Sequence, residues 1–148
     1  MADIVPAQKL FDLSGEVALV TGASSGLGAR FAEVLAAHGA KVIAAARRKD
    51  RLEALAVGNS NIATLALDVT DADKFPAALE DADRAFGPVT LLVNNAGVAS
   101  GGRIVDTAPE EWRRIQQTNV DAVWHLSQGF AKRVIARGRV YLSNATIN

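Results

Sequence analysis

Short runs of apolar residues alternate along this chain with stretches in which apolar residues recur every three or four positions. Runs of the first kind are typical of strands buried on both faces, and stretches of the second kind are typical of helices with one apolar face. The predicted strands are residues 16–20, 41–46, 62–67 and 89–93, with a fifth strand beginning at 139–142. The predicted helices are residues 26–38, 51–57, 71–86 and 109–137.

Strict alternation of strand and helix predicts a doubly wound α/β fold, with a parallel sheet and helices on both of its faces. Ligands in such folds bind at the carboxyl ends of the strands, where the strand order reverses. We expect the first and fourth strands to flank that point. Residues 1–15 form a polar lead-in, and residues 16–148 form one domain.

Helical spacing also predicts which side chains face the sheet. After the first strand these are Phe31, Val34, Leu35 and His38, with Gly39 ending the helix. In the third helix they are Phe75, Leu79, Ala82 and Phe86. In the long helix they are Trp112, Ile115, Val123, Leu126 and Phe130. We expect His38, in a last helical turn, to be a partner of the helix dipole or a packed ring.

Composition narrows the function classes. The chain has 148 residues, 49% of them hydrophobic, with 16 acidic and 16 basic residues and no cysteine. A core-forming domain whose formal net charge is zero gives no indication of a nucleic-acid or membrane partner, a disulfide framework or a metal site. The first six residues show no basic region followed by an apolar run, so we expect no signal peptide there, and no apolar stretch approaches the roughly 18 residues of a membrane span. We expect a cytoplasmic protein.

The first candidate site is the turn Thr21–Gly28, with the sequence TGASSGLG, between the first strand and its helix. A glycine-rich turn that opens a helix presents backbone N–H groups and the positive end of the helix dipole to a phosphate. Gly22 permits the tight turn, Gly26 the close approach of a pyrophosphate, and Gly28 the packing of helix on strand. The alternative is an ordinary glycine turn. A P-loop is excluded because no Gly-Lys-Ser/Thr follows.

Two further turns supply polar groups. Arg47 and Arg48 follow the second strand, and Ala46 occupies the place where an acid would bind the ribose of NAD. An arginine there favours NADP(H), with NAD(H) as the other possibility; the alternative is that both arginines begin an exposed helix. Asp68 and Val69 follow the third strand and could meet adenine, or Asp68 or Thr70 could simply cap the next helix.

The fourth strand is followed by Asn94-Asn95-Ala96-Gly97, small and amide residues that suit either a ligand-binding turn or an ordinary one. Asn119 lies on the predicted buried stripe of the long helix. A buried amide must find partners. It is either bonded to a neighbouring loop or a catalytic group beneath the site.

These motifs occur together in the order and spacing of the short-chain dehydrogenase/reductases, and the chain resembles that family from about Asp12 to Ser143. The resemblance implies a Rossmann-like fold that binds NAD(P)(H) and transfers hydride between the nicotinamide and the carbonyl or alcohol carbon of a small molecule. It implies cofactor-binding roles for the following residues: Gly22, Ser24, Ser25, Gly26, Leu27, Gly28, Arg47, Asp68, Val69, Asn95, Ala96 and Gly97. It also implies a homo-oligomer, with the long helix in the interface or else packed in the core.

By the same resemblance, Asn119 matches the catalytic asparagine of the family, and Ser143, at the end of the fifth strand, matches its serine. The family's tyrosine and lysine, four residues apart, have no counterpart, because Tyr141 is the only tyrosine and Ala145 stands four positions later. We therefore expect an N-terminal portion of a reductase, truncated after about five strands and impaired in turnover. The alternative is a non-catalytic dinucleotide-binding or interaction module.

Overall fold

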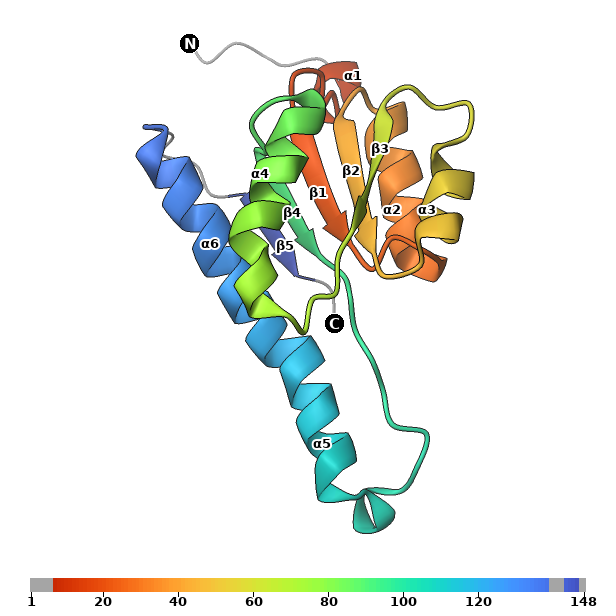
Figure 1. The fold of residues 1–148 in the computed structure, drawn as a ribbon. Helices are drawn as coiled ribbons and strands as arrows, with labels where there is room; N and C mark the ends of the chain where they lie inside the picture. Colours follow the sequence, from red (N-terminus) through yellow and green to blue (C-terminus); the bar gives the residue numbers. More distant parts are fainter. Residues whose placement is uncertain (1–6, 139–142, 147–148) are drawn as a thin grey trace.

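A computed structural model describes residues 7–138 and 143–146 and contains a five-stranded parallel sheet with the order β3-β2-β1-β4-β5 (Figure 1). The strands are β1 (Val17–Thr21), β2 (Lys41–Ala46), β3 (Ile62–Ala66), β4 (Leu91–Asn94) and β5 (Ser143–Thr146). The predicted doubly wound fold is confirmed. The strand order reverses between β1 and β4, as expected, since β2 pairs with one side of β1 and β4 with the other.

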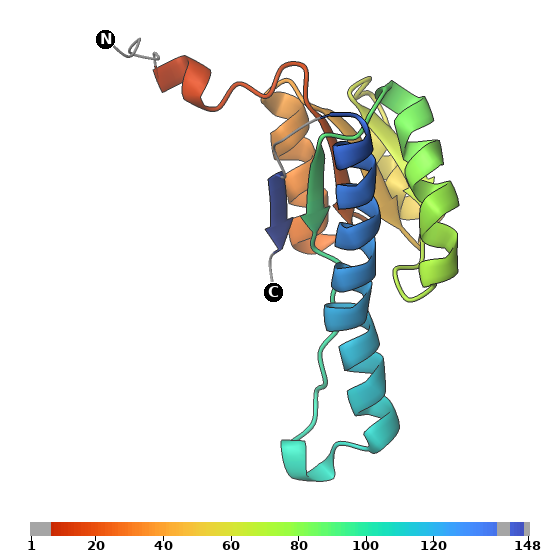
Figure 2. The same ribbon diagram turned by 90° about the vertical axis from the view of Figure 1, so that its left-hand side faces the viewer.

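Helices cover both faces of the sheet. Figures 1 and 2 place α2 (Gly26–Ala37) and α3 (Lys49–Ala56) on one face, and α4 (Phe75–Phe86) and α6 (Ala122–Ala136) on the other. Alternate residues of β1 accordingly enter two cores: Leu19 packs with the side of α4 and α6, and Val20 with the side of α2 and α3. Every residue of β1 is buried. In β3, at the sheet edge, Ile62 is buried and the four residues after it alternate between intermediate and exposed positions.

The face predicted for α2 is confirmed only for Phe31 and Leu35, which are partly buried against the core, and is wrong for Val34 and His38. The buried residues are Gly28, Ala32 and Ala36, whereas Val34 is 38% exposed and His38 is also exposed. Small residues let the helix axis approach the sheet closely, which displaces the larger side chains to the flanks. The ring nitrogen Nδ1 of His38 lies 2.8 Å from the carbonyl oxygen of Val34, so the ring contacts the last helical turn as a dipole partner would.

The predicted helix 109–137 contains an irregular turn. It consists of α5 (Pro109–Gln116), the π-helical segment η3 (Gln117–Asp121) and α6. The side chains that face the sheet are those of Thr118, Ala122, Leu126, Phe130 and Val134. Leu126 and Phe130 are confirmed as core residues, while Trp112 is 56% exposed and its predicted burial is wrong. The wider π turn changes the phase of the face, and α5 extends past the end of the sheet (Figure 2).

Shorter elements complete the described chain. They are α1 (Ala7–Leu10) and the 3-10 turns η1 (Ala72–Lys74) and η2 (Ile104–Asp106). The N–H group of Leu13 donates to the carbonyl of His38 at 2.8 Å, which joins the lead-in to the domain. The predicted strand start at 139–142 lies outside the described residues. Among the helices that the structure describes, none is long and apolar enough to cross a membrane.

An ionic cluster around Asp83 fastens α4 to α6. Its carboxylate accepts hydrogen bonds from Arg133 at 2.6 Å, from Arg137 and from the N–H group of Val89 at 2.9 Å. The Asp83 side chain is only 16% exposed. Burial disfavours its charge, yet the Val89 amide and the two guanidinium groups outweigh burial and lower the pKa of Asp83 below its usual value.

We predict that Asp83→Asn lowers the free energy of unfolding by about 2 kcal/mol at pH 7, because two guanidinium groups lose their counter-charge. Since the pKa of Asp83 is lower in the folded chain, its contribution is complete above the unfolded value of about 4 and is lost as the pH falls through the folded value. Urea unfolding of the wild type and the variant should therefore differ at pH 7 and converge in acid.

The matched control is Asp81→Asn, which removes a carboxylate from an exposed pair with Arg84 and should change the free energy of unfolding by less than about 0.5 kcal/mol. Equal stability of Asp83→Asn and the wild type at pH 7 would contradict a stabilising role for the cluster.

Candidate functional site

An open cavity of about 550 Å³ lies at the carboxyl ends of the strands. The turns that follow β1, β2, β3 and β4 all contribute to its wall, together with Arg114 of α5 and two residues of η3. Eleven of the twelve residues predicted to bind a cofactor line it, and the twelfth, Gly26, begins α2 beside them. These eleven are Gly22, Ser24, Ser25, Leu27, Gly28, Arg47, Asp68, Val69, Asn95, Ala96 and Gly97.

The turn after β1 lets other groups approach its backbone closely. Gly22 and Gly26 have φ angles of 67° and 57°, in the left-handed region that favours glycine. A Cβ atom at Gly22 would lie 2.8 Å from the Cα of Ala96, and one at Gly28 would overlap the Asn95 side chain and the Gly22 carbonyl. Ser25 precedes α2 without a side-chain hydrogen bond that caps it. Donors in the first turn of α2 are thus left for an anion at the cavity.

Thr21 ties the ends of β1 and β4 together. Its buried hydroxyl accepts hydrogen bonds from the N–H groups of Asn95 at 3.0 Å and Ala96 at 3.1 Å, and donates to the Val93 carbonyl at 3.2 Å. The Asn95 side chain donates back to the Thr21 carbonyl at 2.9 Å. The Asn95 amide thus bridges the ends of the two strands. The part played by Thr21 was missed, although its place at the head of the glycine motif was a usable signal.

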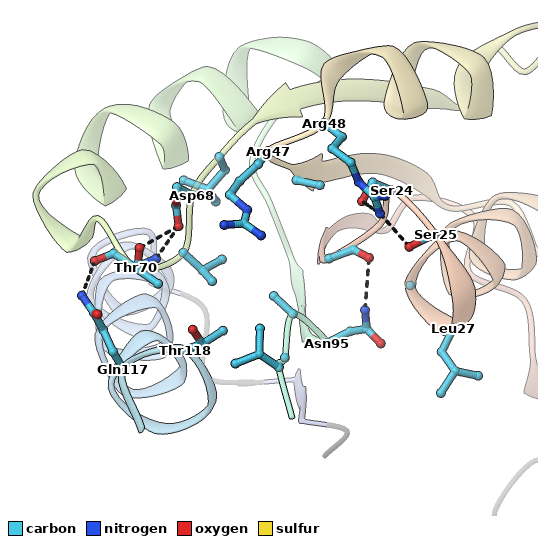
Figure 3. Close-up of a pocket in the computed structure, with 18 of the residues that line it drawn as sticks. Ser24, Ser25, Leu27, Arg47, Arg48, Asp68, Thr70, Asn95, Gln117 and Thr118 are labelled. Atoms are coloured by element: carbon cyan, nitrogen blue, oxygen red, sulfur yellow. Dashed lines mark hydrogen bonds between the residues drawn. The ribbon is translucent and has the colours of Figure 1, made fainter. Parts of the chain in front are cut away.

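Two arginines form the cationic rim of the cavity (Figure 3). Arg47 points into the cavity, whereas Arg48 is directed at the glycine turn. One terminal nitrogen of Arg48 donates to the hydroxyl oxygens of Ser24 at 3.0 Å and Ser25 at 2.9 Å. Arg48 is therefore the more firmly placed of the two, a distinction that adjacent arginines in a sequence cannot reveal.

Asp68 lies at the wall formed by the turn after β3. One of its oxygens accepts hydrogen bonds from the backbone N–H of Thr70 at 2.9 Å and from the Thr70 hydroxyl at 2.8 Å. The Thr70 amide lowers the pKa of Asp68 most, against burial, and Arg47 adds a weaker electrostatic contribution. The expected alternative, a helix cap, is wrong, because Asp71 precedes η1 and Lys74 precedes α4.

Asn119 lies in the π-helical segment and is paired with the loop after β4. Its side-chain oxygen accepts from the N–H of Val98 at 2.9 Å, and its side-chain nitrogen donates to the Val98 carbonyl at 2.8 Å. This two-way contact matches the expectation of a helix amide bonded to a neighbouring loop. Gln117, two residues earlier in the same segment, donates to the Thr70 carbonyl at 3.3 Å and was not predicted.

Ser143 does not lie where the sequence suggested. It begins β5 instead of ending it, and the strand register pairs it with Leu91, whereas Thr146 pairs with Asn94 at the carboxyl end. Three residues of strand correspond to roughly 10 Å. The backbone of Ser143 is therefore displaced along the sheet from the cavity edge.

Comparisons with known proteins agree with this geometry. A family model described as short chain dehydrogenase matches residues 16–141. The chain is 36% identical over 139 residues to gluconate 5-dehydrogenase of Gluconobacter oxydans (strain 621H), covering 91% of the chain and 54% of that protein. It is 38% identical over 132 residues to 3-oxoacyl-[acyl-carrier-protein] reductase of Escherichia coli (strain K12), covering 87% and 54%.

A solved structure is similar throughout the chain. The crystal structure of a short-chain type dehydrogenase/reductase from Mycobacterium marinum superposes with a TM-score of 0.89 at 34% identity, covering 96% of this chain and 59% of that one. The chain spans about half the length of the curated relatives that it matches.

The close approach at Gly28 leads to a prediction. Gly28→Ala should lower the free energy of unfolding by about 3 kcal/mol, because a methyl group has no room between Asn95 and the Gly22 carbonyl. Gly26→Ala is the matched control: open space surrounds that position, so only the positive φ is strained, at a cost of about 1 kcal/mol. Urea unfolding measures both variants, and equal midpoints would contradict the packing of Gly28 against β4.

Proposed function

This chain belongs to the short-chain dehydrogenase family, and we propose that it binds NADP(H) at the carboxyl ends of β1 to β4 and serves hydride transfer to or from a small carbonyl or alcohol compound. The observation that carries the proposal is the convergence of the four strand-end turns on one cavity with a glycine cradle and a cationic rim. We also propose that residues from 16 onward form one dinucleotide-binding domain.

The residues present fit such a cofactor. Gly22 and Gly28 approach the end of β4 closely and place no side chains beside the first turn of α2. A pyrophosphate would accept hydrogen bonds there from backbone N–H groups. Asp68 and Val69 would meet the adenine, and Asn95, Ala96 and Gly97 would line the adenosine ribose. When bound, the nicotinamide ring would supply or accept the hydride.

Preference for NADP(H) over NAD(H) is supported by charge. The rim carries Arg47 and Arg48, and the buried position at the end of β2 is Ala46, which offers no carboxylate to a ribose 2′-hydroxyl. At the end of β2 a 2′-phosphate would therefore meet positive charge, with no carboxylate at position 46 to oppose it.

For proton transfer, we propose that Asn119 takes part in a relay from the position where it also holds Val98. The proposal that Ser143 polarises the substrate oxygen rests on the family resemblance alone. The second candidate function is dinucleotide binding without turnover. It is favoured by one observation: Ala145 follows Tyr141 by four positions, so these 148 residues contain no tyrosine and lysine at that spacing. Steady oxidation of NADPH by the chain with a carbonyl compound would exclude it.

The cofactor preference gives a prediction. The wild-type chain should bind NADPH at least about tenfold more tightly than NADH, as titrated by nucleotide fluorescence. Ala46→Asp should reverse that preference, because a carboxylate repels the 2′-phosphate and accepts a hydrogen bond from a 2′-hydroxyl.

The control is Ala66→Asp, the same change at the exposed end of β3, opposite Ala46 in the sheet but outside the cavity wall. It should leave the ratio of the two affinities within about twofold. An unchanged ratio in Ala46→Asp would contradict the assignment of this edge of the cavity to the adenosine ribose.

We propose further that the whole protein is a homo-oligomer in which the apolar stripe, defined as Val120, Trp124 and Ile135, contacts a second copy. These side chains are 52 to 66% exposed and follow one another along one helical face. Asp121 and Lys132 border the same edge of the stripe. A two-fold axis reverses the second helix, so each Asp121 would lie opposite the other copy's Lys132. This charge complementarity favours a second copy as the occupant.

Replacement of the central aromatic side chain tests the apolar stripe. Trp124→Glu should weaken self-association at least about tenfold, as measured by sedimentation equilibrium, because a charge would be buried in the contact. Val57→Glu, a similar change at an 80% exposed position at the end of α3, should leave association unchanged. Identical association of both variants would contradict the proposed contact.

A further inference from the structure

The π-helical segment η3 connects two walls of the cavity that lie far apart in sequence. Successive side chains of an α-helix are turned by about 100°, and by less in a wider π turn, so three in a row span about half a circle. Gln117 accordingly reaches the turn after β3, and Asn119 reaches the loop after β4. Thr118, between them, is buried at the cavity wall.

The two connections differ in their hydrogen-bond geometry. On the side of β4, the Asn119 side chain makes two short contacts with the backbone of Val98, at 2.9 and 2.8 Å. On the side of β3, the Gln117 nitrogen lies 3.3 Å from the Thr70 carbonyl oxygen, just beyond the usual range of about 2.7–3.2 Å for an N–H···O bond. The Gln117 contact can therefore shorten, whereas the Asn119 contact is already short.

The carbonyl group that Gln117 binds belongs to the turn proposed to meet adenine. The backbone N–H and the hydroxyl of Thr70 hold one oxygen of Asp68, while the Thr70 carbonyl accepts from Gln117 (Figure 3). A base packed against Asp68 and Val69 would order this turn. A carbonyl group that is already ordered loses less conformational entropy when it accepts a hydrogen bond, so base binding would strengthen the Gln117 contact.

We propose that Gln117 is a positioning residue that couples nucleotide occupancy at the turn after β3 to the Asn119–Val98 contact. Binding of the adenosine half orders that turn and shortens the bond from Gln117 to Thr70. The shorter bond stabilises η3 in the geometry in which Asn119 holds the loop after β4. This inference rests on the proposed nucleotide-binding function and extends it to the wall at which Asn119 lies. The coupling is reciprocal, so the Asn119 contact also favours nucleotide binding.

Hydrogen exchange of the full chain tests the coupling without any need for turnover. The Val98 N–H group donates to the Asn119 side chain, so its exchange rate, followed by NMR, reports how often that contact opens. The probe is adenosine 5′-monophosphate, added to saturation. We expect it to slow Val98 exchange at least about fivefold in the wild type, which is within the usual range of coupling between two sites.

Gln117→Met removes the amide donor and keeps an unbranched, helix-favouring side chain of similar length. It should bind the nucleotide about fivefold more weakly in calorimetric titration, because the coupling no longer favours binding. At saturation, the nucleotide should then slow Val98 exchange by less than about twofold. The matched control is Gln116→Met, at the neighbouring position outside the cavity wall, which should behave like the wild type. Thermal melting of each variant checks that the chain is folded.

A double-mutant cycle measures the same coupling from the other side. Asn119→Ala should weaken nucleotide binding about fivefold in the wild-type background and less than about twofold in the Gln117→Met background. An equal loss in both backgrounds would mean that Asn119 acts independently of Gln117, and would overturn the inference.

The remaining failures are distinguishable. If the nucleotide slows Val98 exchange equally in the wild type and in Gln117→Met, it covers Val98 directly; the inference is then wrong and the proposed nucleotide site stands. Binding without any slowing in the wild type leads to the same conclusion. A wild type that does not bind the nucleotide overturns the proposed site together with the inference.

Discussion

The contact on which this structure most depends joins the ends of β1 and β4. The Thr21 hydroxyl is shared by two backbone N–H groups of the turn after β4, and the Asn95 amide returns a hydrogen bond to β1. Gly28 allows α2 to approach the same point, because any larger residue would overlap Asn95. A strand, a turn and a helix are therefore fixed against one another where the strand order reverses. This contact forms the floor of the cavity, because the turns that follow parallel strands all lie at the same edge of the sheet.

The electrostatic character of the cavity arises from position and not from composition. The chain as a whole has a formal net charge of zero. At the strand ends, however, the first turn of α2 and both arginines after β2 line one cavity, and Asp68 lies in the same wall on the side of Arg47. Hydrogen bonding to Thr70 lowers the pKa of Asp68, so its carboxylate stays ionised. This negative charge offsets part of the positive charge of Arg47, the nearer arginine. The arginine farther from it, Arg48, keeps its charge against neutral hydroxyls. Two identical neighbours in the sequence thus acquire different electrostatic surroundings.

Most residues of the cavity wall could be predicted because the ends of the strands can be recognised in the sequence. Apolar runs mark the strands, each run ends in a turn, and a doubly wound sheet brings those turns to one edge, so the residues of the cavity wall follow from their positions alone. Features that depend on packing distance could not be predicted. Helix α2 buries small alanines in place of its larger side chains because its axis lies close to the sheet. The π turn at Gln117–Asp121 rotates the buried face of the long helix. The place of Ser143 depends on strand register, which the apolar pattern does not determine. The contact of Arg48 with Ser24 and Ser25 depends on side-chain direction.

Nucleotide recognition and proton transfer are assigned to different elements of this fold. Every group proposed here to hold the adenosine half of the dinucleotide lies between Thr21 and Gly97, in turns that the β1–β4 contact positions directly. Asn119 belongs to a different element, and its side-chain amide uses both of its polar atoms on Val98. That pairing connects the π-helical segment to the loop after β4, so the residue proposed for the proton relay also sets the position of the cavity wall. A substitution at Asn119 would therefore act on the shape of the cavity as well as on proton transfer. Since none of the phosphate-binding groups contacts Asn119, such a substitution should alter the wall near Val98 and leave the cationic rim intact.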